Sequence, residues 1–190
     1  MADKIFVVGT SSGGLAALQV LLPGLPEDFP CPLVVVQHRG KEPGSGLCDF
    51  LQRSSRLPIG EPEDKEPIAQ GRIYLAPRDY HLLIEKGNFA LSTDAPVSYA
   101  RPSVDVLFES AADAYGESVV GVILTGANED GARGLAKIKS AGGLALVQEP
   151  ATAQTPEMPQ AAIAATNIDR ILPLREIAPF LNNLCHVSLG

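Results

Sequence analysis

The sequence lacks any apolar run long enough to cross a bilayer, and no secretory signal precedes its first apolar segment. Cysteine is also scarce, since the chain has only Cys31, Cys48 and Cys185. Their odd number and wide spacing fit free thiols in a reducing compartment better than a disulfide framework. These absences predict a cytoplasmic protein that does not insert into a membrane.

The chain has fewer positively charged residues than negatively charged ones. The 190 residues include 15 Lys and Arg against 22 Asp and Glu, which gives a formal net charge of −7. A hydrophobic fraction of 45% and a charged fraction of 19% are nevertheless ordinary for a globular protein. Because net negative charge repels phosphate groups, we expect a folded protein whose main partner is neither nucleic acid nor an anionic membrane surface.

Several signatures of bound cofactors are missing. A phosphate-binding loop needs Gly-Lys-Ser/Thr after its glycines, whereas Leu15 follows Gly14 here. The dinucleotide pattern G-x-G-x-x-G is absent after the first apolar run, and no group of His, Cys, Asp and Glu has the spacing of zinc ligands. We therefore expect neither a cofactor nor a metal ion.

The pattern of apolar residues predicts one α/β domain over residues 1–190, because the length suits a single core and no repeat or linker divides it. Short apolar runs typical of buried parallel strands alternate with helical patterns. A β-hairpin is expected to attach to the main sheet at residues 82–91. In the closing helix, Pro179 is expected to be tolerable only in the first turn. Strands are predicted at 5–8, 33–36, 73–76, 119–124, 144–147 and 168–172, and helices at 12–22, 47–51, 102–115, 131–142, 156–165 and 177–181.

A possible nucleophile lies between the first strand and the first helix. Residues 9–13 have the pattern G-x-S-x-G, whose glycines allow a sharp turn that can expose Ser11 at the edge of the sheet. The N-terminus of the following helix would favour a negatively charged oxygen there. The pattern alone fits a nucleophilic serine and an anion-binding turn equally well.

A serine nucleophile needs a base, and the chain offers three histidines. His186 lies near the chain end and is discounted. His38 directly follows a predicted strand and His81 follows another, and either could instead be a loop histidine bonded to backbone. Asp130, in the loop after residues 119–124, could orient the imidazole, although an aspartate before a helix is commonly its N-cap.

Beyond these patterns, the chain resembles the catalytic domain of the bacterial chemotaxis protein-glutamate methylesterases, the CheB type. The resemblance extends over nearly the whole chain, and its Arg-Pro-Ser-Val-Asp-Val-Leu-Phe run is the most specific part. The matching segments are residues 8–14, 37–38, 73–77 with Asp79 and His81, 101–108, and 121–126 with Asp130 and Gly131.

The resemblance implies a doubly wound, Rossmann-like three-layer fold and a serine hydrolase with a catalytic triad. The family's nucleophile, general base and orienting aspartate correspond to Ser11, His38 and Asp130. Its members remove methyl groups from glutamate esters on chemoreceptors and deamidate certain glutamines. Further residues expected at the oxyanion or substrate-binding site are Ser12, Ala127, Arg101 and His81, although Arg101 could equally form a surface salt bridge.

Two departures from the family pattern keep alternatives open. Ala127 and Asn128 stand where the family usually has Met-Gly, and we expect the catalytic domain to act without the family's N-terminal receiver domain. The protein could therefore be a module that binds a receptor or methyltransferase without turnover, or a serine hydrolase of another ester or amide. Expected partners are a methyl-accepting chemoreceptor or related signalling protein, together with a methyltransferase or a separate regulator.

Overall fold

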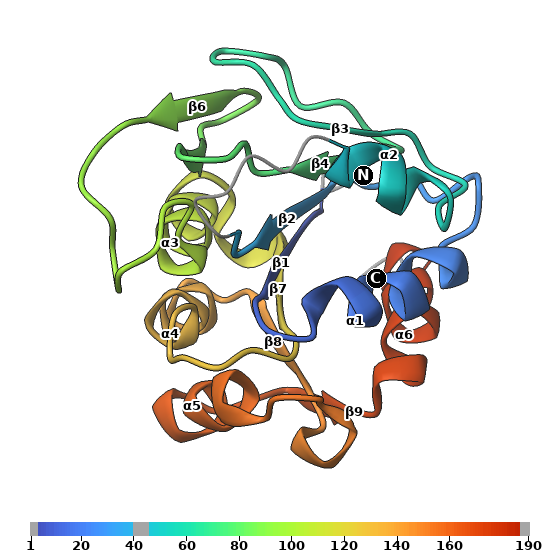
Figure 1. Ribbon diagram of the computed structural model, residues 1–190, viewed down its shortest axis with the longest axis vertical. Helices are drawn as coiled ribbons and strands as arrows, with labels where there is room; N and C mark the ends of the chain where they lie inside the picture. Colours follow the sequence, from blue (N-terminus) through green and yellow to red (C-terminus); the bar gives the residue numbers. More distant parts are fainter. Residues whose placement is uncertain (1–3, 40–45, 187–190) are drawn as a thin grey trace.

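The centre of the molecule is a parallel β-sheet. A computed structural model describes residues 4–39 and 46–186, and within them seven strands pair in the order β3-β4-β2-β1-β7-β8-β9 (Figure 1). All neighbouring strands of this sheet run parallel. The strands are β1 (Ile5–Thr10), β2 (Leu33–Gln37), β3 (Ile59–Gly60), β4 (Ile73–Leu75), β7 (Val119–Ile123), β8 (Leu144–Gln148) and β9 (Arg170–Leu172).

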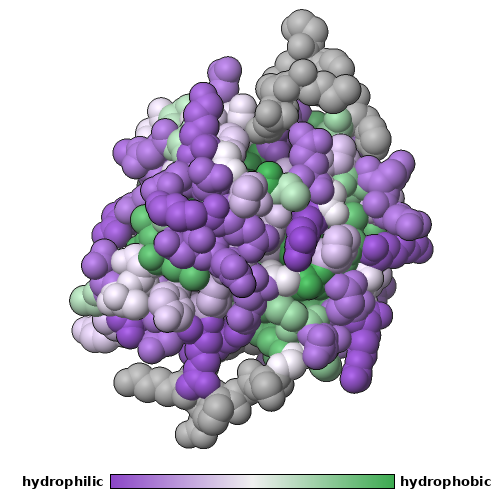
Figure 2. Space-filling model, turned by 90° about the horizontal axis from the view of Figure 1, so that it is seen from above, coloured by the Kyte–Doolittle hydropathy of each residue, from purple (hydrophilic) through white to green (hydrophobic). Residues whose placement is uncertain are grey.

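Helices cover both faces of the sheet, which makes a three-layer α/β fold (Figure 1). On one face lie α3 (Val104–Tyr115), α4 (Ala132–Ser140) and α5 (Glu157–Ala165), and on the other lie α1 (Gly14–Leu21), α2 (Leu47–Gln52) and α6 (Leu174–His186). Side chains of β1 alternate between the two cores, as in any strand: Val7 packs on the α3 side and Val8 on the α1 side. From above, hydrophilic residues cover most of the surface (Figure 2).

The predicted hairpin exists, but its expected attachment to the main sheet is wrong. Strands β5 (His81–Ile84) and β6 (Phe89–Ser92) form a separate antiparallel sheet. The edge of β4 that could have received the hairpin is occupied by β3, a two-residue strand that the sequence pattern did not reveal. The hairpin instead packs through side chains, with Phe89 against Tyr74 at 4.6 Å between ring centroids.

Helix α6 also corrects an expectation. It begins at Leu174, so Pro179 lies inside the helix and not in its first turn. The apolar face formed by Ile177, Ala178 and Leu181 is buried in the core beside α1, and this burial offsets the lost backbone hydrogen bond. Within the described residues, no helix combines the length and apolar character needed to cross a membrane.

Candidate active site

Three chain segments meet at the carboxyl edge of the sheet. Ser11 follows β1, His38 follows β2, and the loop of residues 124–131 follows β7. Strand β1 is the point at which the chain changes direction across the sheet, with β2 on one side and β7 on the other. Open parallel sheets bind their ligands at such a switch point. The sequence-predicted triad residues therefore lie where the fold most readily builds a site.

Ser11 is held in a tight turn directly before α1. Its carbonyl accepts a hydrogen bond from Gly14 N at 2.9 Å, and its own N–H donates to Thr125 O at 3.0 Å. Gly13 has φ of +78°, and a Cβ there would lie 2.8 Å from the side chain of Gln154. Only glycine satisfies both restrictions, which explains the second glycine of G-x-S-x-G.

Gln37 joins Ser11 to His38. Its buried amide Nε2 donates to the carbonyl oxygens of both residues, at 2.9 Å each. His38 N also donates to Thr10 O at 3.0 Å, which continues the pairing of β1 with β2. No role for Gln37 was predicted from the sequence, although a polar residue at the end of a fully buried strand was an available signal.

Asp130 holds the imidazole of His38. Its Oδ2 lies 2.7 Å from His38 Nε2 and also accepts from Val104 N at 2.8 Å. Its Oδ1 accepts from Ser103 Oγ and Asp105 N, both at 2.9 Å. Burial would raise the pKa of Asp130, but the hydrogen bonds from His38 and from the two backbone N–H groups outweigh it and lower the pKa. Asp130 is therefore an ionised acceptor, and His38 carries its proton on Nε2.

The two acidic residues near this point cap each other's helices. Asp130 does not cap α4, as its position before that helix suggested, but bonds to the first N–H groups of α3. Asp105, in the first turn of α3, in turn accepts from Gly131 N at 3.0 Å and Gly134 N at 2.6 Å at the start of α4. This role of Asp105 was not predicted from the sequence. The exchange fixes α3, α4 and His38 in one arrangement.

Asp105 also predicts a pH effect on stability. Burial, with a smaller contribution from the charge of Asp130, raises the pKa of Asp105 to about 6. In an unfolded chain the pKa is about 3.9, so ionising Asp105 opposes folding above pH 6 and has no effect below about pH 4. Asp105→Asn keeps an oxygen for both N–H groups without the charge. Its free energy of unfolding, relative to the parent, should rise by up to about 3 kcal/mol between pH 4 and pH 8 in urea titrations.

The control for this prediction is Asp113→Asn, which removes an exposed carboxylate of the same helix. That variant should show no comparable trend with pH. A relative stability of Asp105→Asn that stays constant or falls as the pH rises contradicts the argument.

Asn128 occupies the other nitrogen of His38. Its Nδ2 donates to His38 Nδ1 at 3.2 Å, and its Oδ1 accepts from Asp130 N at 3.0 Å. Among the residues that the structure describes, no hydrogen bond joins the hydroxyl of Ser11 to His38. The structure thus brings all three predicted triad residues to one edge and directly joins two of them.

Two predicted substrate-binding residues have structural roles instead. His81 is 2% exposed, with Nε2 donating to Ala95 O at 3.0 Å and Nδ1 accepting from Ser103 N at 3.3 Å. Both of its nitrogens are therefore used in holding backbone, and the side chain is buried. Arg101 pairs with Asp79 at 2.8 Å and donates to the carbonyls of Thr93 and Asp94, which is the surface salt bridge considered as its alternative.

Ser12, directly after Ser11, and Ala127, in the loop after β7, are both exposed. The carbonyl of Ser12 accepts from Thr125 Oγ1 at 2.9 Å, which links the turn to the loop after β7. Gly126, just before Ala127, approaches so closely that a Cβ there would lie 3.0 Å from Ser11 Cβ. Their positions are compatible with the predicted oxyanion site.

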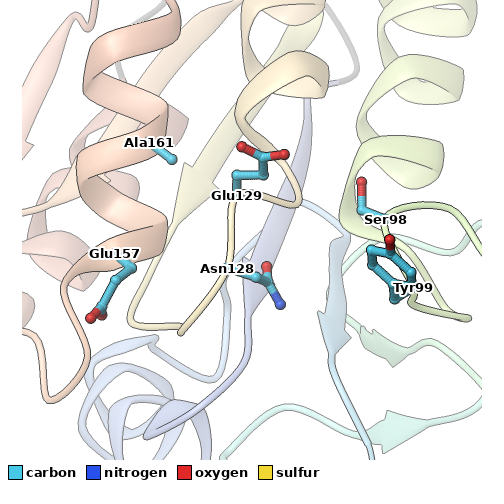
Figure 3. Close-up of a pocket in the computed structure, with 6 residues that line it drawn as sticks. All are labelled: Ser98, Tyr99, Asn128, Glu129, Glu157 and Ala161. Atoms are coloured by element: carbon cyan, nitrogen blue, oxygen red, sulfur yellow. The ribbon is translucent and has the colours of Figure 1, made fainter.

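A cavity of about 680 Å³ opens beside this group. Asn128 belongs to its lining, so the cavity reaches the residue that contacts His38 (Figure 3). The opposite wall is a turn whose residues Ser98 and Tyr99 have φ of +49° and +62°, a strained backbone that leaves Tyr99 fully exposed. The lining residues are Ser98, Tyr99, Asn128, Glu129, Glu157 and Ala161.

The arrangement suits acyl transfer. A serine directly before a helix shares one edge of the sheet with an imidazole whose Nε2 is bonded to a buried carboxylate, and a cavity reaches Asn128, which contacts that imidazole. Among the described residues, no group of three His, Cys, Asp or Glu side chains could hold a metal ion.

Comparison with known proteins gives consistent matches over nearly the whole chain. Residues 6–181 match the family described as CheB methylesterase. A relative from Leptospira interrogans, named putative protein-glutamate methylesterase/protein-glutamine glutaminase, is 49% identical over 179 residues, which are 94% of this chain and 93% of the relative. The solved catalytic domain of the CheB methylesterase of Thermotoga maritima has a TM-score of 0.89 and 34% identity, covering 97% of this chain and 100% of that one.

A longer relative shows a different coverage. The protein-glutamate methylesterase/protein-glutamine glutaminase 2 of Anaeromyxobacter dehalogenans is 44% identical over 181 residues. The match covers 95% of this chain but 53% of that protein. The chain is thus similar to about half of this relative and to almost all of the one from Leptospira.

Proposed function

The chain belongs to the CheB methylesterase family, and on this basis we propose that it hydrolyses glutamate methyl esters of chemoreceptors, releasing methanol, and deamidates receptor glutamines. The observation that carries the proposal is the 2.7 Å contact between His38 Nε2 and Asp130 beside Ser11, at the switch point of the sheet. We propose Ser11 as nucleophile, His38 as general base and Asp130 as the residue that orients His38.

The hydrogen bonds of His38 determine which nitrogen acts as the base. Because Asp130 accepts the proton on Nε2, the free electron pair is on Nδ1. Nδ1 takes the proton of Ser11 as its Oγ attacks the ester carbonyl, and the resulting imidazolium is stabilised by the charge of Asp130. Nδ1 then gives the proton to the departing methoxide, and methanol leaves an acyl-serine.

Water completes the reaction by the same proton transfers. It loses a proton to His38 Nδ1 as it attacks the acyl-serine, and Ser11 recovers the proton when the glutamate carboxylate is released. The negative oxygen of each tetrahedral intermediate would lie at the N-terminal end of α1, near Ser12 and Ala127, where backbone N–H groups can donate to it. A glutamine side chain would react alike, with ammonia as the leaving group.

The test is methanol release from a carboxyl-methylated chemoreceptor domain, with the unmethylated domain as the control. We expect release from the methylated domain alone. A protein that reacts with a serine-directed phosphonate but releases no methanol would be a hydrolase of another ester or amide, and one that does neither would be a binding module. Either result overturns the proposal.

The proposed substrate also implies a location and partners. A chemoreceptor's methylated segment is cytoplasmic in the family, so we propose that the chain acts in the cytoplasm. A methyltransferase that makes the ester, and a regulator that acts on this domain, are further proposed partners. These proposals are supported by the family membership and not by a contact in the structure.

A further inference from the structure

The resting site contains a contact that conflicts with the proposed chemistry. His38 Nδ1 accepts a hydrogen bond from Asn128 Nδ2 at 3.2 Å, while Nε2 is held by Asp130 at 2.7 Å. Both nitrogens of the imidazole therefore have partners. The electron pair that should receive the proton of Ser11 is already in use.

The amide of Asn128 cannot simply turn over to resolve the conflict. Its Oδ1 accepts from Asp130 N at 3.0 Å in an Asx turn, which directs the NH₂ group toward His38. Once Nδ1 carries a proton, two donors would face each other. The protonated imidazole that forms during the reaction is thus incompatible with the resting position of Asn128.

We propose that Asn128 blocks the basic nitrogen of His38 in the resting enzyme and releases it when a ligand enters the adjoining cavity. The inference rests on the proposed function, since it assigns regulation to the same site. Asn128 acts through His38 and is a positioning residue, not a catalytic one.

The cavity provides the means of release. Asn128 is half-buried and forms part of the cavity lining, with Glu157 and Tyr99 on other walls (Figure 3). A substrate segment that fills the space between them meets the Asn128 side chain as it approaches Ser11. Its backbone carbonyls offer acceptors for the amide NH₂ group in exchange for His38 Nδ1. Filling of the cavity and activation of the base are thereby coupled.

Two substitutions of Asn128 distinguish its contact with His38 Nδ1 from its hydrogen bond to Asp130 N in the turn. Asn128→Ser retains an oxygen that can accept from Asp130 N but is too short to reach His38. Asn128→Asp also retains the turn and nearly the shape of asparagine, but presents a carboxylate oxygen to Nδ1, which favours the protonated imidazole. The first variant frees the base, and the second holds it in its inactive form.

The measurement is the rate at which a small fluorophosphonate, which does not fill the cavity, labels Ser11 at pH 7. Because a neutral hydrogen bond corresponds to roughly a threefold to tenfold population ratio, Asn128→Ser should label about threefold to tenfold faster than the parent. Asn128→Asp should label more slowly than the parent. If Asn128 served only the turn, both variants would label like the parent, and that result would overturn the proposal.

A spectroscopic measurement provides a second criterion that does not depend on reactivity. In ¹⁵N spectra, His38 Nδ1 of Asn128→Ser should move to the position of an imidazole nitrogen that accepts no hydrogen bond, while Nε2 remains protonated. An unchanged Nδ1 signal overturns the proposal even if neither protein is labelled. A parent that labels on Ser11 but releases no methanol contradicts only the proposed substrate, and so the two failures are distinguishable.

Discussion

Replacing Ser11 with alanine should lower kcat for methanol release by roughly 10⁶-fold, to the level left by binding and oxyanion stabilisation alone. The side-chain oxygen of Ser11 is the atom that forms the acyl intermediate, so alanine leaves no nucleophile at this position. The measurement is single-turnover release of methanol from the methylated receptor domain.

The fold should survive this substitution. Hydrogen bonds that anchor Ser11 use its main-chain atoms, with Thr125 O as acceptor and with Gly14 N and Gln37 Nε2 as donors. The variant should therefore unfold at the same urea concentration as the parent. Ser140→Ala, at the exposed far end of α4, is the matched control and should retain full activity. Equal methanol release by Ser11→Ala and the parent would exclude the serine mechanism.

The sheet was largely predictable because its central strands are buried and almost entirely apolar. In β1, β2 and β7 the apolar residues are continuous and do not alternate with polar ones, which is typical of strands buried on both faces. These runs alternate with helical patterns along the chain, and that alternation predicted the α/β class. Strand β3 has two residues, too few to form a pattern, so the second neighbour of β4 in the sheet was not predicted.

The site residues that directly follow strands could be predicted from the sequence. Ser11 and His38 directly follow paired strands, so sequence position alone brings them together. His81 has an equally favourable position, but its nitrogens are bonded to Ala95 O and Ser103 N. These partners come from a loop and a helix start, whose approach is determined by tertiary packing. No local pattern distinguishes such a histidine from a catalytic one.

The run of residues 101–108 shows that a motif can identify a family although its structural role is not apparent from the sequence. The run of residues 101–108 was the most specific part of the family resemblance, yet it contains none of the proposed triad. Its Ser103 and Asp105 act through Asp130 and Gly131, which are more than twenty positions away. The run forms the helix start that receives Asp130, so its sequence is constrained by the geometry of the active site.

Asp130→Asn should therefore impair both catalysis and folding. The side chain of asparagine has one acceptor oxygen, whereas the carboxylate of Asp130 has two. If Nδ2 takes the place of Oδ2, the N–H groups of Val104 and of His38 Nε2 both face another donor. The imidazole would be held in the wrong tautomer or orientation, for which we expect kcat to fall by roughly 10⁴-fold. Loss of acceptors for buried donors should lower the free energy of unfolding by roughly 2–5 kcal/mol at pH 7.

The pH dependence identifies the ionised carboxylate as the cause. The pKa of Asp130 is lower in the folded protein than in an unfolded chain, so its charge stabilises the fold above about pH 4 and ceases to do so as the pH falls further. The stability deficit of Asp130→Asn should then be present at pH 8 and shrink as the pH falls below about 4. Asp105→Asn, the matched substitution of the other capping carboxylate, should show its change between pH 4 and pH 6. It should also retain far more activity, because the carboxylate of Asp105 is bonded to Gly131 N and Gly134 N and not to the imidazole of His38 in the described residues. Equal loss of activity in the two variants would mean that catalysis depends on the arrangement of the α3 and α4 N-termini and not on the charge of Asp130 beside His38 Nε2.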